Sequence, residues 1–342
     1  MIKKERNIQL DFLRFIGISC IILAHQDIPS FLFQLRNFDV PLMVLVSGIS
    51  YVRFSEKHYK SYFIYLKNRF IRLVIPTWLF LIFYNFFLYI YSSASVNYAN
   101  LFKQFMLVGG TDIGVWIIRV FASMAIIAPV ISFYNNKCEK NIQYYLSFVS
   151  ILIFYIFIYY ISKKFTPQSI FDLLNLIIFP TVGYSLLLWH GMRIDKFDKK
   201  NLKFQIFLSA SIFTALFFYL YFKDHSLVQT QLYKYPPRPY YLLYAMMISI
   251  LLYHLSENFS IPLTKFVQFI GSSTLWIYLW HWFVMRLYNH FQFNFHYIIN
   301  YLVVYTLSVF IVYIQYRIVL IFIEKSSISN KSKKFVRKIL TG

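Results

Sequence analysis

The stretch YYLSFVSILIFYIFIYYIS, residues 144–162, carries no charged side chain. A helix needs about 20 mostly apolar residues to cross the hydrocarbon core of a bilayer. Other segments of the chain have the same character as this one. Together the candidate spans are 8–28, 38–55, 73–92, 113–134, 144–162, 170–190, 204–222, 240–256, 271–290 and 297–323. The sequence therefore predicts an all-α integral membrane protein with about ten transmembrane helices.

The composition excludes a soluble enzyme. Of 342 residues, 59% are hydrophobic and 14% are charged, whereas soluble chains average about 45–50% apolar and about 25% charged residues. One soluble core of this size could not bury so much apolar surface. The formal net charge is +21, but a nucleic-acid-binding protein would be far less apolar, so we expect no nucleic-acid partner.

Lysine and arginine residues gather in every second connection between the candidate spans. By the positive-inside rule this pattern places both termini in the cytoplasm of a multi-pass protein of the cell membrane. No Gly/Ser- or Pro-rich linker divides the chain, so we expect one domain over residues 1–342, with a helical core at about 6–322. The basic, amphipathic tail at 324–342 is expected on the inner leaflet.

Polar side chains in the first candidate span follow one helical face. Arg14 and His25 are eleven residues apart, which brings them within about 20° of each other on a helix, and Asp11 lies one turn before Arg14. Such residues are costly in a bilayer and therefore point to function. The structural alternative is an ion pair between Asp11 and Arg14, with His25 at the membrane interface.

Two further motifs lie near the second and third spans. Arg69 and Arg72 have i,i+3 spacing just before the third apolar run, so their guanidinium groups could grip a phosphorylated ligand. The alternative is an ordinary positive-inside anchor. Ser47 and Gly48 interrupt an apolar run, and small residues there permit close approach of another helix or of a ligand.

A candidate binding segment is the outer connection Gln229–Ala245, where several prolines stiffen the chain. Its tyrosine rings could stack on a ligand while lysine and arginine donate hydrogen bonds. The alternative is an interfacial aromatic belt with basic anchors. The candidate binding residues are Tyr233, Lys234, Tyr235, Arg238 and Tyr240.

In this order the motifs resemble the acyltransferase-3 family of integral membrane acyltransferases, which modify cell-surface carbohydrates. The resemblance runs from Arg6 to about Phe322. It is carried by R-x10-H with its L-D-x-L-R setting, by the Ser-Gly segment, by R-x-x-R with its following Leu73 and Pro76, by a looser match at Gly114–Pro129 with Trp116, and by WIYLWH at Trp276–His281. The chain departs from the family's usual Phe-Phe ahead of Ser-Gly, because Leu42–Val46 stands there.

The resemblance implies transfer of an acyl group, usually acetyl, from cytoplasmic acyl-CoA to a hydroxyl of a carbohydrate acceptor beyond the membrane. With such an acceptor, the tyrosines of Gln229–Ala245 could stack on its sugar rings, which makes that segment the candidate acceptor site. It implies that Arg69 and Arg72 bind the donor phosphates, that Ser47 and Gly48 lie along the donor, and that Arg14 binds the pyrophosphate or fixes Asp11. His25 is the expected general base, since histidine has an unperturbed pKa near 6.5. Direct transfer and an acyl-histidine intermediate both remain open, and His281 is the rival base.

Other functions remain open at this stage. Transfer of succinyl or another acyl group fits the same motifs. A transporter or flippase for a lipid-linked saccharide fits the many spans, but it does not explain the arginines aligned with His25, and no inverted repeat is visible. No metal site is expected, because no cluster of His, Cys and carboxylate residues occurs. The expected partners are acyl-CoA as donor substrate, the acceptor glycan and the lipid bilayer, with no permanently bound cofactor.

Overall fold

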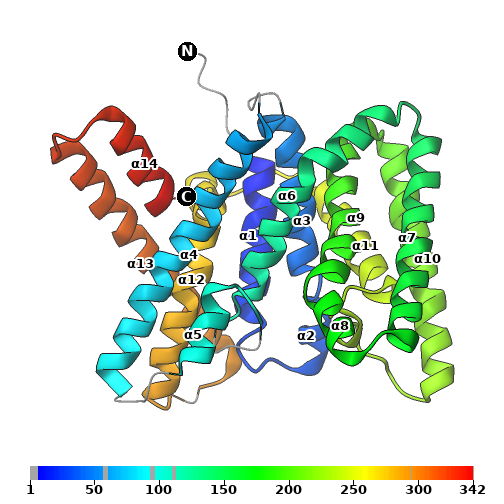
Figure 1. Cartoon of the computed structure of the whole chain (residues 1–342), viewed down its shortest axis with the longest axis horizontal. Coiled ribbons are helices and arrows are strands. Elements are labelled where there is room, and N and C mark those ends of the chain that lie inside the picture. Colours follow the sequence, from blue (N-terminus) through cyan, green and yellow to red (C-terminus); the bar gives the residue numbers. More distant parts are fainter. Residues whose placement is uncertain (1–6, 57–60, 93–96, 110–112, 294, 342) are drawn as a thin grey trace. The chain divides into compact units, whose positions relative to one another are not determined.

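A computed structural model describes residues 7–56, 61–92, 97–109, 113–293 and 295–341 of the chain (Figure 1). These residues form helices and no strand, which confirms the predicted all-α class. Apolar segments adopt helices because a helix satisfies its own backbone N–H and C=O groups where no water is available. Each predicted span overlaps a helix or a run of consecutive helices.

The chain divides into two compact units, each built from separate stretches of sequence. Unit 1 comprises Met1–Pro29, Phe63–Ala122 and Pro262–Gly342. Its elements are α1 (Ile8–Leu23), α4 (Tyr62–Ser92, from its second residue), α5 (Tyr98–Phe105), the first turns of α6 (Trp116–Lys137), α12 (Thr264–His290), α13 (Tyr297–Lys325) and α14 (Asn330–Leu340).

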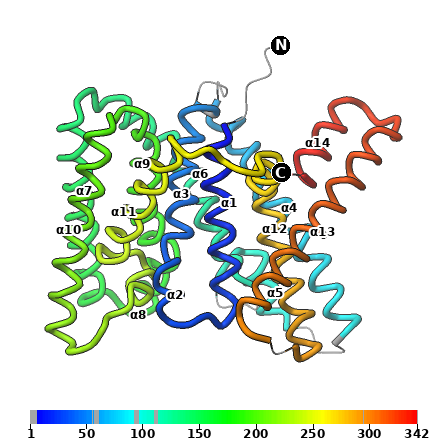
Figure 2. The backbone as a smooth tube through the Cα atoms, turned by 180° about the vertical axis from the view of Figure 1, so that it is seen from behind, coloured from blue at the N-terminus to red at the C-terminus, as the bar shows by residue number. Residues whose placement is uncertain are grey.

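Close packing of α1 on α12 organises unit 1 (Figure 2). Gly271 of α12 makes this possible, because a Cβ atom there would lie 2.7 Å from the Cα of Asp11 on α1. Helix α13 packs against α12, and α14 packs against α13. Three helices that carry the predicted motifs, α1, α4 and α12, thus all lie in unit 1.

Unit 2 comprises Ser30–Tyr62 and Ser123–Ile261. Its main packing pairs are α3 with α9 and α10 with α11. Besides the rest of α6, its elements are α2 (Ser30–Leu35), α3 (Asp39–Ser50), η1 (Tyr51–Ser55), α7 (Asn141–Phe165), α8 (Gln168–Leu173), η2 (Leu174–Ile178), α9 (Phe179–Arg193), η3 (Ile194–Lys196), α10 (Lys199–Asp224), η4 (Thr230–Tyr233) and α11 (Pro239–Ser256).

Eight helical segments of the described chain are long and apolar enough to cross a membrane. Burial differs among them: 11% of the most apolar window of α7 is buried, against 61% in the segment Ser30–Phe54. A largely unburied apolar helix is the expected form of a helix that faces lipid. Length and composition thus support a multi-pass membrane protein.

The predicted count of about ten spans remains a prediction. Helix α1 is 16 residues long, shorter than a typical span, and α12 carries many polar and aromatic residues. Placement of both termini in the cytoplasm and one domain over residues 1–342 also remain predictions. Residues 1–6 and residue 342 lie outside the described residues.

Candidate functional site

The polar stripe of the first span has a different form from the one that the sequence suggests. Asp11 is buried, and its Oδ1 lies 3.0 Å from Nη1 of the partly exposed Arg14. The ion pair expected under the structural alternative is therefore present. Helix α1 ends at Leu23, so His25 lies in the turn after the helix, and Asp27 has a positive φ of 48°.

Arg14 and His25 are consequently far apart. Nine residues of helix at 1.5 Å per residue already separate Arg14 from Leu23 by roughly 14 Å. The predicted catalytic roles of Asp11 and Arg14 stay predictions.

His25 lies against two aromatic side chains of α12. Its ring centroid is 4.6 Å from that of Trp282 and 5.6 Å from that of His281. His25 itself is half-buried, whereas His281 is completely buried. The late WIYLWH motif and the turn after α1 therefore meet at one place in unit 1.

His281 has a fixed proton arrangement. Its Nδ1 contacts the carbonyl oxygen of Tyr278, which can only accept, so Nδ1 carries the hydrogen and Nε2 keeps its lone pair. Within the described part of the chain, Nε2 of His281 is buried and has no hydrogen-bond partner. A buried acceptor in this condition is costly unless a substrate, a water or another donor fills it.

The mid-chain motif contacts two aromatic residues of the same helix, α12. The hydroxyl of Tyr278 donates to the carbonyl oxygen of Gly114 at 2.5 Å. A Cβ atom at Gly114 would lie 2.7 Å from Cζ2 of Trp282, so the backbone must approach the indole ring without a side chain. Nearby, Nη1 of Arg119 donates to the carbonyl oxygen of Leu107 at 3.0 Å, which is a structural contact.

Arg69 and Arg72 both lie on α4 in unit 1. The guanidinium of the half-buried Arg69 lies 5.3 Å from the ring centroid of Tyr65, within cation–π range. Arg72 is exposed one turn later. Because the two arginines are three residues apart on a helix, they present their guanidinium groups on neighbouring positions of one surface.

Ser47 and Gly48 belong to α3 in unit 2. A Cβ atom at Gly48 would lie 2.1 Å from the carbonyl oxygen of Leu188 on α9, and one at Gly191 would lie equally close to that of Leu45. Gly48 therefore serves the close approach of another helix, which is the first of its two predicted roles. Ser47 donates its hydroxyl to the carbonyl oxygen of Met43 at 2.8 Å, and contact of either residue with a donor stays a prediction.

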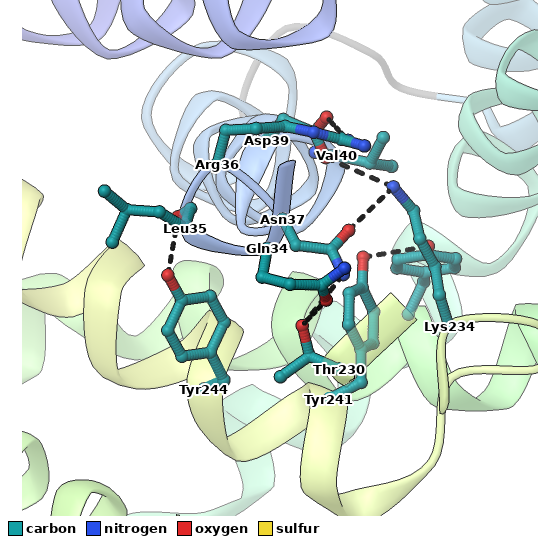
Figure 3. Close-up of polar contacts among 11 residues, drawn as sticks. Gln34, Leu35, Arg36, Asn37, Asp39, Val40, Thr230, Lys234, Tyr241 and Tyr244 are labelled. Atoms are coloured by element: carbon teal, nitrogen blue, oxygen red, sulfur yellow. Dashed lines mark hydrogen bonds and ion pairs between the residues drawn. The ribbon is translucent and has the colours of Figure 1, made fainter. Parts of the chain in front are cut away.

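The segment Gln229–Ala245 of unit 2 holds Lys234 in a buried polar network (Figure 3). We call Arg36, Asn37, Asp39 and Lys234 the Asp39 cluster. Nζ of Lys234 donates to Oδ1 of Asn37 at 3.2 Å and to Oδ1 of Asp39 at 3.4 Å. Nη1 of Arg36 donates to Oδ2 of Asp39 at 2.7 Å. Burial lowers the pKa of Lys234, while Asp39 opposes that shift.

Most of the other predicted acceptor residues also contact this segment or the residue before it. Tyr240 is buried and donates to the carbonyl oxygen of Val228 at 3.2 Å. The guanidinium of Arg238 lies 4.0 Å from the ring centroid of Tyr233. Tyr235 is 55% exposed, which makes it the most exposed tyrosine among the candidate binding residues.

Comparison with known protein families identifies the family of this chain. Residues 7–317 match the family model described as an acyltransferase domain, which covers nearly the whole described chain. The chain belongs to the acyltransferase-3 family. The protein is therefore a multi-pass membrane acyltransferase. It matches no curated protein and no solved structure.

Several residues of this acyltransferase were not predicted as important from the sequence. Arg36 and Asp39 share the i,i+3 spacing of Asp11 and Arg14, and a carboxylate at the start of an apolar run was a usable signal. Gly271 gave no signal, because its role depends on α1. Asn68 gave none either, because its partner Lys338 lies 270 positions away in the sequence.

Proposed function

We propose that this acyltransferase moves an acetyl group from cytoplasmic acetyl-CoA to a hydroxyl of an envelope, capsular or exopolysaccharide glycan in the cell membrane. The observation that carries the proposal is the position of His25. It lies against Trp282 and His281 beyond the last residue of unit 1's first helix, while the Asp11–Arg14 pair lies in the first half of that helix. A donor with anionic phosphates at one end and a thioester at the other suits this separation.

His25 is the proposed general base for direct transfer. A neutral imidazole nitrogen accepts the proton of the acceptor hydroxyl as the oxygen attacks the thioester carbonyl carbon. The C–O bond forms, the C–S bond breaks, and the thiolate of CoA leaves and takes the proton from the imidazolium. A base in this role contributes about 10²–10⁴-fold to the rate.

The cations of unit 1 are the proposed donor-binding groups. Arg69 and Arg72 present paired guanidinium groups, which suit phosphate oxygens. Arg14, held by Asp11, would bind a more deeply placed part of the donor. We expect acyl-CoA, the glycan and the bilayer as partners, and no permanently bound cofactor.

His281 is the second candidate for the base. Its buried Nε2 has a lone pair and no partner among the described residues. This nitrogen could therefore accept a proton, or it could accept a hydrogen bond from an N–H group. Separate substitutions of His25 and His281, rather than the positions of their rings, show which of the two is the general base.

The test follows labelled acetyl from acetyl-CoA to an envelope polysaccharide fraction in membranes that contain the full chain. His25→Ala should lower transfer by about 10²–10⁴-fold while acetyl-CoA binding persists. His296→Ala, which removes an exposed histidine, should transfer like the unsubstituted protein. If His25→Ala keeps its activity and a folded His281→Ala loses it, His281 is the base. If label appears only with succinyl-CoA or a longer thioester, the acetyl assignment is wrong.

A further inference from the structure

Helix α14 (Asn330–Leu340) is fixed to unit 1 by its last turn. Nε1 of Trp276 donates to the carbonyl oxygen of Ile339 at 3.0 Å, and Nε2 of Gln315 donates to that of Leu340 at 2.7 Å. The last carbonyls of a helix have no partners within the helix, so these two side chains cap it. Ile339 is also buried. The tail is therefore a docked helix, although it lies beyond the residues that match the family.

The docked turn brings Lys338 to the R-x-x-R motif. Its Nζ donates to the side-chain oxygen of Asn68 on α4. Asn68 and Arg72 lie four residues apart on one face of that helix, and Arg69 directly follows Asn68. We call Asn68, Arg69, Arg72 and Lys338 the Arg72 cluster. All four belong to unit 1.

The electrostatic surroundings of Lys338 are positive. Burial, the charge of Arg72 and the charge of Arg69 together lower the pKa of Lys338. Within the described ranges no carboxylate forms an ion pair with Lys338. Like charges near Lys338 disfavour its protonated form, and an anion bound beside it would offset that effect.

We propose that Lys338 joins Arg69 and Arg72 in binding the phosphate groups of the acyl donor. The inference rests on the proposed function and adds a residue to the same site. The two arginines offer planar forks that grip phosphate oxygens, and the lysine offers a compact point charge beside them. Anchoring α14 through Trp276 and Gln315 holds that charge in place before the donor arrives.

Anionic lipid headgroups carry phosphates too, and a basic amphipathic helix is a common lipid-binding element. The two sources make different demands on α14. A lipid surface would attract exposed lysines such as Lys334 as readily as Lys338. The donor site requires Lys338 in particular, because only the last turn is docked beside Asn68.

The experiment measures acetyl-CoA affinity by calorimetry on the full chain in nanodiscs of phosphatidylcholine, with and without phosphatidylglycerol. Lys338→Gln should weaken affinity about tenfold in both lipid compositions, since it removes one charge-assisted contact. Lys338→Arg should keep most of the affinity. Lys334→Gln, a matched loss of charge on the same helix, should bind like the unsubstituted protein. Equal melting temperatures exclude misfolding as the cause.

Three results would overturn the inference, and they separate it from the proposed function. If Lys338→Gln binds acetyl-CoA normally while Arg72→Gln does not, Lys338 has no role and the proposed function stands. If Lys338→Gln and Lys334→Gln lose affinity equally and only with phosphatidylglycerol present, the helix binds lipid. If the unsubstituted protein binds no acetyl-CoA in either composition, the proposed function fails as well.

Discussion

Two groups of cations in this acyltransferase differ in what faces their charges. In the Asp39 cluster, the carboxylate of Asp39 lies between Arg36 and Lys234, and all three side chains are buried. In the Arg72 cluster, the charges that act on Lys338 are those of Arg69 and Arg72. In the first arrangement a carboxylate faces both cations and joins segments far apart in sequence. The second brings like charges near Lys338, and under the proposal above it binds an anionic donor.

The comparison also separates two uses of similar residues. A lysine in a loop rich in tyrosines looks like a ligand-binding residue in the sequence, but Lys234 is 2% exposed and bound to Asn37 and Asp39. A lysine in a basic tail looks like a membrane anchor, but Lys338 is held beside Asn68. The role of each lysine therefore follows from the side chains around it and not from its residue type. Lys234 contacts a carboxylate, whereas Lys338 contacts a neutral amide.

The largest effect is expected from Asp39→Asn. This change removes the carboxylate that faces two buried cations, and uncompensated buried charge typically costs about 3–5 kcal/mol. The apparent melting temperature of the detergent-solubilised protein, followed by intrinsic fluorescence, should fall by several degrees. Asp172→Asn removes an exposed carboxylate of the same unit and should leave it nearly unchanged. If the two variants have the same apparent melting temperature, the Asp39 cluster is not a structural ion-pair network.

A smaller effect is expected in the pH dependence of donor binding. Lys338 binds phosphate only when protonated, and its pKa is lowered by burial and by the charges of Arg72 and Arg69. Affinity should therefore be full below that lowered pKa and should decline as pH rises through it, before the value near 10.4 of an ordinary lysine. A thioether analogue of acetyl-CoA, which resists hydrolysis, measures this between about pH 8 and pH 10.

Lys338→Arg provides the control for this pH dependence, since an arginine stays charged throughout the range. The affinity of the Lys338→Arg variant for the analogue should not change between about pH 8 and pH 10. The affinity of the unsubstituted protein should fall a few-fold over the same range. Parallel curves for the two proteins would show that another group titrates.

The sequence predicted the local features of this protein well. Long apolar runs predict helices because each helix satisfies its own backbone, and Asp11 and Arg14 meet because they are one turn apart. Gly48 was predicted to allow close approach, and α9 approaches there. These features depend on residues within one segment.

The features that were not predicted depend on distant residues or on a helix end. Asp39 meets Lys234 across 195 positions of sequence, and no local pattern links them. Docking of α14 depends on Trp276 and Gln315 of other helices. The end of α1 at Leu23 changes the relation of Arg14 to His25, and the only sequence signal for it is the polar pair Gln26–Asp27 before Pro29.

The most direct test of the central claim is acetyl-CoA binding to the double variant Arg69→Gln/Arg72→Gln. Loss of two guanidinium–phosphate contacts should weaken binding by about 100-fold or more, with the melting temperature close to that of the unsubstituted protein. Lys67→Gln, an exposed charge on the same helix, should bind acetyl-CoA normally. A double variant that binds acetyl-CoA as tightly as the unsubstituted protein would contradict the account.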